Sequence, residues 1–438
     1  MAAIDKSIYE EIVIESADGS KTVDIGQGVM QIRYFEDLFS PNITATIFVV
    51  NTGNTVEGKD GKLTTIYNGL PLRGGERVVM KIAGNSDLNE GLDFSESSLY
   101  WHVKSVTGVM IDEQQESFML NLVPREAITN ETSRVGKKYP ASSSISDSVK
   151  DIVAKYLKTE KKVECDKTQN PYGFVGNLRK PFTVLMWLAS KGVPGTVSGE
   201  DATAGYFFYE TQDGYNFKSI DQLIDDEPYE TDYEYSSGVI ANDPNNDFKI
   251  LSFQASKNQD LMEKLKRGAY CSHRIYFNPL TFTYTNPEKG LFKLENYAGK
   301  SKNMGEKITL PALSENDDKT LGDVPSRNIT AVMDIGTMEK GASITENADP
   351  TKIHSQSMMR YNLLMTHTAT MLIPLNTNLR AGSLIKCKFP KIDMENRTDV
   401  SEDQSGLYMV KELCHQFDPK GSYTKLTLFR DTMGPQEK

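Results

Sequence analysis

The chain has 438 residues, which is too long for one compact core and predicts about two to four domains. With 38% hydrophobic and 25% charged residues, its composition indicates a soluble globular protein and excludes a disordered one. A net charge of −11 and a pI near 5.2 argue against a nucleic-acid-binding surface, which would be basic, although nucleic acid could still pass nearby without binding.

The sequence carries no targeting or membrane-spanning pattern. No apolar run approaches the roughly 18 residues needed to cross a bilayer. The opening stretch MAAIDKSIYEEIVIES lacks a basic segment followed by an apolar core, so we expect no secretory signal. Cys165, Cys271, Cys387 and Cys414 form no CxxC pair and no framework of a small secreted domain. We therefore expect four reduced thiols in a protein made in the cytoplasm.

The first quarter of the chain is rich in short strand patterns. Ile12 and Ile14 alternate with other residues, and a turn at 18–19 follows. The stretch 28–53 reads as two strands joined by a short turn-like segment. Further strands are predicted in ERVVMKIAG, LYWHVKSVTGVM and ESFMLNLV. Many short strands at turn-punctuated spacing predict a barrel or a sandwich.

The hydrophobic period changes after Pro124. In SSISDSVKDIVAKYLK the apolar residues recur every three to four positions from Ile145, which predicts an amphipathic helix. Ser144 and Asp147 give the S-x-x-D form of a capping box at its start. A second helix is predicted from Pro181 to near residue 192, and GYFFYETQDGYNFKSIDQLI predicts a hairpin that turns at 213–214 and leads into a short helix.

Strand patterns return after this α+β region. The acidic, turn-rich stretch 225–238 reads as a solvated connection. Strands are predicted from Phe248 onward and are interrupted by the helical pattern NQDLMEKLKRGAY. Residues 286–355 are loop-rich, and the C-terminal residues are strands again. This order predicts a β-rich α+β fold with two β-domains flanking the middle region.

The last part of the chain, GLYMVKELCHQFDPKGSYTKLTLFRDTMGP, predicts two antiparallel strands around a Pro/Gly turn. Leu407, Met409 and Leu413 occupy alternate positions and are expected to share one face. Cys414 and His415 are adjacent, and neighbouring side chains of a strand point to opposite faces, so they cannot form a thiolate–imidazole pair. We expect Cys414 to be a small buried apolar residue.

Two stretches resemble ligand-binding loops without meeting their requirements. GNTVEGKD (53–60) begins like a phosphate-binding loop, but Asp60 stands where magnesium needs a hydroxyl and no helix pattern follows. DPNNDF (243–248) begins like a calcium loop, but Phe248 stands where the tight turn needs Gly and Gln254 where a Glu belongs. We interpret the first as a polar loop tip and reject the second.

No catalytic set stands out. Neither a nucleophile motif nor a HExxH pair is present, and carboxylates are too numerous to single out a glycosidase pair. Cys271 and His273 could place two metal ligands on one strand face, and a composite site with Cys387 or His415 stays open. We assign no catalytic, cofactor-binding or metal-binding residues and expect no cofactor.

Several of these stretches, in this order, resemble one family. The matching pieces are MQIRYFEDLFSPNITATIFVVNT, ESFMLNLVPREAITNETSRVGKKY, SISDSVKDIVAKYL, RKPFTVLMWLASK followed by GYFFYETQDGYNFKSID, MMRYNLLMTHTATMLIPLNTNLRAGSLIKCKFP, and the terminal LFRDTMG. Together they resemble the central baseplate hub proteins of contractile-tailed bacteriophages, a family related to the hub portions of contractile secretion machines. The likeness is weakest between residues 285 and 350.

The resemblance implies a structural protein without enzymatic activity. In that family three copies form a ring around an axial channel, and each copy supplies two tail-tube-like β-barrels, so that the ring joins the six-fold tail tube to the three-fold central spike. For this chain it implies a first barrel over 1–126, an α+β domain over 127–245, a second barrel over 246–285 and 356–438, and a loop-rich insertion over 286–355. The terminal hairpin would then close the second barrel.

The resemblance also implies partners and a location. The partners would be two further copies of the chain, the central spike protein and the tail tube or tube-initiator proteins, with tape measure and wedge proteins as further candidates. Specific nucleic-acid binding and membrane insertion are not expected, and a channel-facing surface should be neutral to acidic. The protein would be assembled in the host cytoplasm and reside in the tail baseplate of the virion. The alternative is a tail-associated enzyme that degrades the cell wall.

Overall fold

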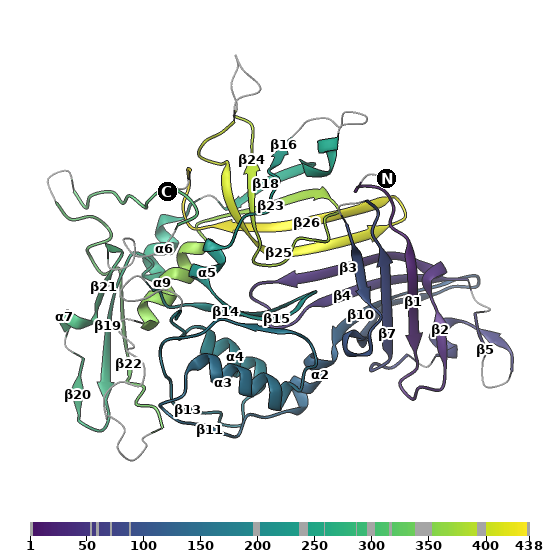
Figure 1. The fold of residues 1–438 in the computed structure, drawn as a ribbon, viewed down its shortest axis with the longest axis horizontal. Coiled ribbons are helices and arrows are strands. Elements are labelled where there is room, and N and C mark those ends of the chain that lie inside the picture. Colours follow the sequence, from purple (N-terminus) through teal and green to yellow (C-terminus); the bar gives the residue numbers. More distant parts are fainter. Residues whose placement is uncertain are drawn as a thin grey trace.

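The computed structural model describes residues 3–52, 55–57, 61–70, 72–86, 89–195, 202–235, 244–257, 259–285, 287–295, 303–314, 318–337, 353–391 and 400–435. A large sheet occupies the upper right of Figure 1, a helical layer lies below it, and a smaller sheet lies at the left. The β-rich α+β class predicted from the sequence is confirmed. None of the helices in these ranges is both long and apolar enough to cross a membrane.

Fifteen strands belong to one hydrogen-bonded sheet. Its main path runs in order through β17 (Lys249–Ile250), β16 (Tyr233–Tyr235), β24 (Leu384–Lys388), β25 (Gly406–Asp418), β3 (Val29–Asp37), β4 (Thr44–Asn51), β10 (Glu116–Pro124), β9 (Trp101–Ile111), β7 (Arg77–Ala83), β1 (Tyr9–Glu15) and β2 (Thr22–Asp24). Branching from it, β25 pairs with β26 (Gly421–Arg430), β26 with β23 (His367–Pro374), β23 with β18 (Ser252–Lys257), and β7 with β8 (Gly91–Phe94). Within the described ranges no sheet closes on itself, so the strands form an open sheet.

The pairing of β3 with β25 joins the two ends of the chain in this sheet. The strands are antiparallel, with Tyr34 opposite His415 and Phe35 opposite Cys414. Tyr34 belongs to the same hydrophobic core as Leu413. Strands from the first and the last parts of the sequence therefore share one core.

Alternation along β3 explains how this core forms. Ile32, Tyr34 and Glu36 are buried, whereas Arg33 and Phe35 between them are partly exposed. Successive side chains of a strand point to opposite faces of a sheet, so one face of β3 lies in the core and the other does not. The neighbouring strands β4 and β10 repeat this alternation.

The alternation predicted for the C-terminal strand is wrong in one respect. Leu407 and Met409 do not share a face with Leu413, because they pack in a second hydrophobic cluster while Leu413 packs in the core of the main sheet with Val410. The register of β25 against β26 shifts between Val410 and Glu412. Such a bulge adds one residue to the strand and moves every following side chain to the other face.

The middle region contains the predicted helices and hairpin. The Ser144 hydroxyl accepts a hydrogen bond from the backbone N–H of Asp147, as a capping box requires, and a helix follows that ends in a π-helical turn over Val153–Leu157. The second predicted helix begins at Pro181, and the predicted hairpin leads into a short helix, so these predictions are confirmed. The elements are α2 (Arg125–Thr132), β11 (Lys138–Tyr139), α3 (Ile145–Ile152), β12 (Val163–Cys165), β13 (Phe174–Val175), α4 (Pro181–Ala189), β14 (Tyr206–Thr211), β15 (Gly214–Ser219) and α5 (Ile220–Asp225).

The β14–β15 hairpin lies between the main sheet and the helices α3 and α4 (Figure 1). Phe208 and Phe217 of the hairpin pack in one cluster with Val149 of α3 and Leu185 of α4. Residues of β14 on the other side, among them Phe207, pack in the same cluster as Leu407 and Met409 of β25. The hairpin is therefore covered on both faces and holds the helical layer against the main sheet.

A smaller sheet lies apart from the main one. Its central strand is β19 (Cys271–Asn278), which pairs in parallel with β22 (Arg327–Val332) and antiparallel with β20 (Thr283–Tyr284) and β21 (Leu291–Lys293). The helices α6 (Leu261–Arg267), α7 (Pro287–Gly290) and α9 (Ser355–Leu364) accompany it in sequence, and β5 (Val56–Glu57), β6 (Leu63–Thr64) and α1 (Ile66–Gly69) form a small unit near the first strands.

Candidate functional site: an open-edged sheet and a polar junction

Cys414 and His415 are not a reactive pair. His415 is fully buried on the core side of β25, where its ring stacks on that of Tyr34, while Cys414 is 8% exposed and pairs across the strands with Phe35. Burial raises the pKa of the Cys414 thiol to about 12, so the thiol stays protonated at neutral pH. Burial, with a smaller contribution from Arg380, lowers the pKa of His415 to about 3, so the imidazole stays neutral. The prediction that Cys414 is buried is confirmed.

The remaining candidate ligands do not meet. Cys271 and His273 lie on β19 in the smaller sheet, whereas Cys387 and His415 lie on β24 and β25 of the main sheet. In the described ranges, no group of three or more His, Cys, Asp or Glu side chains is placed to hold a metal ion. The composite site that the sequence left open is therefore not formed by these residues.

The two loop-like motifs fall partly outside the described residues. Positions 53–54 and 58–60 of the first stretch, and position 243 of the second, lie outside those ranges. Residues Pro244–Phe248 form a 3₁₀ turn that precedes β17.

A continuous path of paired strands carries an open edge at each end. The path is β18–β23–β26–β25–β3–β4–β10–β9. At one end β18 pairs with β23 alone, and at the other β9 pairs with β7 only through its first two residues, which leaves residues 105–111 without a described strand partner on that side. Val109, Met110 and Ile111 are exposed along this edge, with Met110 67% exposed. An exposed apolar edge strand is a template for pairing with another chain.

The face of this path that points away from the core is mostly uncharged. One row of cross-strand neighbours consists of Tyr423, Gln416, Arg33, Thr46, Asn121 and Ser105. The Asn121 amide donates hydrogen bonds to the hydroxyls of Ser105, at 3.2 Å, and Thr107, at 3.1 Å. Arg33 is the single charged member of the row, and charges of both signs, Glu412 and Lys425, occur elsewhere on the face. The face is polar without a continuous basic stripe.

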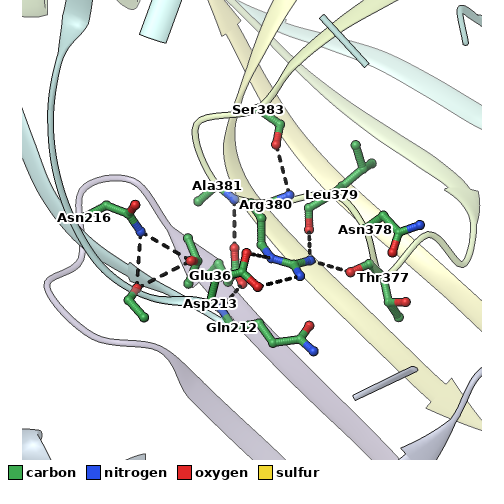
Figure 2. Close-up of polar contacts among 12 residues, drawn as sticks. Glu36, Gln212, Asp213, Asn216, Thr377, Asn378, Leu379, Arg380, Ala381 and Ser383 are labelled. Carbon is green, nitrogen blue, oxygen red and sulfur yellow. Dashed lines mark hydrogen bonds and ion pairs between the residues drawn. The ribbon is translucent and has the colours of Figure 1, made fainter. Parts of the chain in front are cut away.

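A polar junction on the opposite, core-facing side joins three segments that are far apart in the sequence. Glu36 of β3 is 1% exposed. Its Oε1 accepts hydrogen bonds from the Tyr34 hydroxyl at 2.7 Å and from the backbone N–H of Gln212, in the β14–β15 turn, at 2.8 Å. Its Oε2 accepts one from the backbone N–H of Ala381, in the loop before β24, at 2.8 Å (Figure 2). One carboxylate therefore contacts β3, the β14–β15 turn and the loop before β24, and we name this set of contacts the Glu36 junction.

Arg380 lies beside this carboxylate but is bound elsewhere. Its Nε and Nη2 donate to the two carboxylate oxygens of Asp213 at 2.7 and 3.1 Å, and its Nη1 donates to the carbonyls of Leu379 and Thr377 (Figure 2). Burial raises the pKa of Glu36 to about 6, while the Arg380 guanidinium and the three hydrogen bonds act in the opposite direction. Because Asp213 offsets the charge of Arg380, burial has the larger effect.

A second polar contact fastens the same hairpin to the main sheet. The Oε2 of Glu210, on β14, accepts a hydrogen bond from the backbone N–H of Ile43 at 3.1 Å. Its Oε1 bonds the Lys161 ammonium at 2.6 Å, and Lys161 also lies 3.3 Å from a carboxylate oxygen of Glu126. All three charged side chains are almost fully buried. The hairpin is thus held by two buried carboxylates in addition to its apolar contacts.

A cavity of about 260 Å³ adjoins the junction. Both cations that line it already face carboxylates: Arg380 bonds Asp213, and Lys218 lies 3.5 Å from Glu164 and 4.0 Å from Asp226. These contacts leave no ready partner for an anionic ligand among the described lining residues. The cavity reads as a gap between packed segments, not as a binding site.

Comparison with known proteins identifies the relatives of this fold. No family model matches the chain. The "probable baseplate hub protein gp334" of Vibrio phage KVP40 is 22% identical over 319 residues, and the alignment covers 66% of each chain, so the chain spans just under two thirds of that relative's length. The resemblance to baseplate hub proteins is confirmed.

Solved structures extend the likeness to phage tail proteins. The 43 kDa tail protein of prophage MuSo2 from Shewanella oneidensis is 11% identical, with a TM-score of 0.52 over 97% of this chain and 99% of that one. A tail protein from Neisseria meningitidis MC58 is 10% identical, with a TM-score of 0.53 over 96% of each chain. At such low identity these likenesses show that the hub-like chain shares their fold.

Sequence reasoning missed the principal residues of the Glu36 junction. Asp213 was noticed only as part of a turn, and Glu36 only as the start of a turn-like segment, although it is the penultimate residue of β3. Arg380 drew no attention. The only available signal was that Glu36 continues the alternating buried positions of its strand, where an acidic residue is out of place unless it is hydrogen-bonded.

Proposed function

We propose that the chain is a structural hub of a contractile-tail baseplate, in which three copies close a ring that joins the six-fold tail tube to the three-fold central spike. One observation carries the proposal: a continuous path of paired strands ends in two open edges, β18 at one end and β9 at the other. Pairing of β9 of one copy with β18 of the next would extend the sheet from copy to copy. The resemblance to baseplate hub proteins, in which three copies form a ring, supports this arrangement.

The difference between the two edges sets the kind of symmetry. A contact between two unlike surfaces is head-to-tail, and it generates a closed ring when the rotation between copies closes. Exposed Val109, Met110 and Ile111 support the use of the β9 edge, since an edge meant to stay single is usually short, charged or covered. On the β18 edge, Gln254 and Ser256 are exposed and uncharged, so they would not repel an approaching strand.

The domain map implied by the resemblance fits the same ring. We propose tube-like barrels over 1–126 and over 246–285 with 356–438, an α+β domain over 127–245, and an insertion over 286–355. The pairing of β3 with β25 supports this map, because it places strands of the two proposed barrels side by side. Three copies would then present two barrel-like units each, which is the number that a six-fold tube requires.

We propose that the mostly uncharged face of the strand path lines the axial channel. A polyanion could pass such a surface without being held, because each phosphate contact with Lys or Arg adds affinity. Three copies would carry a net charge of −33, three times the −11 of one chain, which also disfavours binding of DNA. The remaining partners of a hub, the spike below and the tube or tube initiator above, would contact the two ends of this ring in the tail of the virion, after assembly in the host cytoplasm.

A cysteine pair placed on the two edges tests the ring. In the double variant Val109→Cys with Gln254→Cys, a short bismaleimide linker should join neighbouring copies and give covalent products that stop at three. The matched control replaces Val109→Cys with Leu63→Cys, which is equally exposed but lies off the strand path, and should give no such products. Products that stop at two or continue beyond three, or a particle with another copy number on its axis, would contradict the proposal.

The alternative function, a tail-associated enzyme that degrades the cell wall, makes a different prediction. No observation among the described residues favours it. Purified chain incubated with cell-wall material should release no fragments, and clear turnover by a chain that never forms a ring would overturn the hub proposal in favour of the enzyme.

A further inference from the structure

The Glu36 junction holds an ionisable group at the only described point where β3, the β14–β15 turn and the loop before β24 share one hydrogen-bond acceptor. The group is a carboxylate with 1% exposure, and none of its described contacts is a direct ion pair. An ionised carboxylate loses favourable hydration when it is buried, and hydrogen bonds replace only part of it. If the turn or the loop moves away from β3, water reaches the carboxylate and the unfavourable burial is relieved.

The groups that face Glu36 from each side leave its charge only partly balanced. From its own strand, Tyr34 donates a hydrogen bond. From the loop before β24, Arg380 lies close enough to lower the pKa of Glu36, but both of its outer donors are taken by Asp213 of the turn.

The hairpin and β25 add no cation that faces Glu36 directly. From β14, Glu210 is bound to Lys161, and the phenol of Tyr209 is neutral because burial raises its pKa far above the physiological range. From β25, His415 stacks on Tyr34 and remains uncharged because burial keeps its pKa near 3.

We propose that the Glu36 junction is a pH-sensitive hinge between the main sheet and the β14–β15 hairpin: it is closed most tightly when Glu36 is protonated, and ionisation of Glu36 favours local opening. The direction follows from linkage. In the closed junction burial raises the pKa of Glu36 to about 6, and in an opened, hydrated junction it returns toward the ordinary value of 4.5. The closed form therefore binds the proton more tightly, and opening becomes easier as pH rises through this interval.

Hydrogen exchange at the junction measures this opening. The backbone amides of Gln212 and Ala381 donate directly to Glu36, so they exchange only when the junction opens. After correction for the intrinsic pH dependence of amide exchange, the opening equilibrium reported by peptides covering 211–215 and 379–383 should rise by about tenfold between pH 5 and pH 8, because each pKa unit corresponds to a factor of ten. Peptides from β10, which lie far from Glu36, should show no such step.

Two variants separate this hinge from general flexibility. Glu36→Gln keeps the shape of the side chain but removes the titration, so the pH step should vanish in both peptides. Asp213→Asn, at a position whose side chain is 61% exposed, frees the guanidinium of Arg380 to neutralise Glu36 and should shrink the step and move it to lower pH. Because Asp213 is on the surface, this variant should fold even if the buried substitution does not.

The matched control is Glu96→Gln, an exposed glutamate on the loop after β8 with no described side-chain contact, which should keep the full step. A step that survives in Glu36→Gln, a step that is unchanged in Asp213→Asn, or no step in the unmodified chain would each overturn the proposal. The experiment uses a single chain in solution, so its result does not depend on whether three copies form a ring.

Discussion

His415 of β25 stacks on Tyr34 of β3, with ring centroids 5.8 Å apart and ring planes 7° from parallel. The two residues are also directly opposite each other in the strand register. The Tyr34 hydroxyl continues the contact to Glu36, and the His415 Nδ1 lies 2.9 Å from the Thr424 hydroxyl on the next strand, β26. A histidine that looked like half of a reactive pair in the sequence therefore joins three strands of the core.

Replacement of His415 by alanine should destabilise the main sheet strongly. The substitution removes a fully buried ring and its stacking partner contact, and large-to-small changes of this kind cost about 3 kcal/mol or more. Denaturation by urea, followed by tryptophan fluorescence, should show the loss. Lys425→Ala, on an exposed neighbouring position of β26, should change stability by less than about 0.5 kcal/mol. Equal effects of the two substitutions would contradict this assignment of His415 to the core.

The chain should lose stability as the pH falls below 6. Burial lowers the pKa of His415 to about 3 and those of His354 and His367 to about 4, while the unfolded chain takes up these protons near pH 6.5. A lowered histidine pKa gives stability that is complete above pH 6.5 and is lost as the pH falls toward the folded value. Glu36 acts in the opposite direction but contributes only one proton.

His415→Phe tests the acid effect while keeping an aromatic ring against Tyr34. The variant removes one of the three protons, so its stability should fall less steeply between pH 6 and pH 4, by about 1.4 kcal/mol per pH unit. Urea denaturation at a series of pH values measures both slopes. Parallel slopes for the variant and the unmodified chain would mean that His415 does not titrate as its burial requires.

Removal of the Lys161 ammonium should be far more damaging than removal of its neighbour. Lys161→Met leaves Glu210 and Glu126 as two buried carboxylates without their shared cation, a change that typically costs about 3–5 kcal/mol. Lys162→Met removes only an exposed ion pair with Glu164 and should cost about 0–1 kcal/mol. Thermal unfolding of both variants provides the comparison, and similar melting temperatures would show that the buried charges are not coupled.

A charge on the β9 edge should impair association without impairing folding. In Met110→Lys the new ammonium lies at an exposed position, so the unfolding free energy should change by less than about 0.5 kcal/mol. Self-association measured by light scattering or native mass should fall, because charged residues on an edge oppose strand pairing. Leu63→Lys, at an exposed position off the strand path, is the control and should leave association unchanged.

Cations placed on the polar face should create DNA binding that the unmodified protein lacks. Thr46→Lys with Asn121→Lys puts two cations in one row of the proposed channel lining. Retention of DNA should appear and weaken with salt, with a slope that grows by about 0.9 per phosphate contact. Thr22→Lys with Gln114→Lys adds the same charge off this row and should have a smaller effect. Tight DNA binding by the unmodified ring at physiological salt would refute a non-binding channel.

Local signals in the sequence were sufficient to predict the helices and the terminal hairpin. The capping residue Ser144 and the apolar period after it define α3, and Pro181 defines the start of α4. The bulge in β25 was not predictable in this way, because no residue near Lys411 marks it and its cause is the change of neighbours from β24 to β3 along the strand. Register at such a point is set by tertiary contacts.

The Glu36 junction was beyond sequence reasoning for a related reason. Its members are brought together from residues near 36, 212 and 380, and their meeting depends on how the β14–β15 hairpin packs against the main sheet. A single sequence reveals which positions of a strand are buried, but not which distant backbone amides will face them. The burial of an acidic residue was the one anomaly that could have been noticed.

The pairing of β3 with β25 has a consequence for how the protein is made. Asp37 pairs with Glu412, which lies 375 positions later in the chain. At a synthesis rate of about 5–20 residues per second, β3 waits roughly 20–75 seconds on the ribosome before its partner exists. During that time its outer edge and the apolar residues of the shared core remain uncovered. Nascent chains should therefore be held by chaperones until the last strands emerge, and truncation ahead of residue 406 should yield aggregated protein, not a folded N-terminal half.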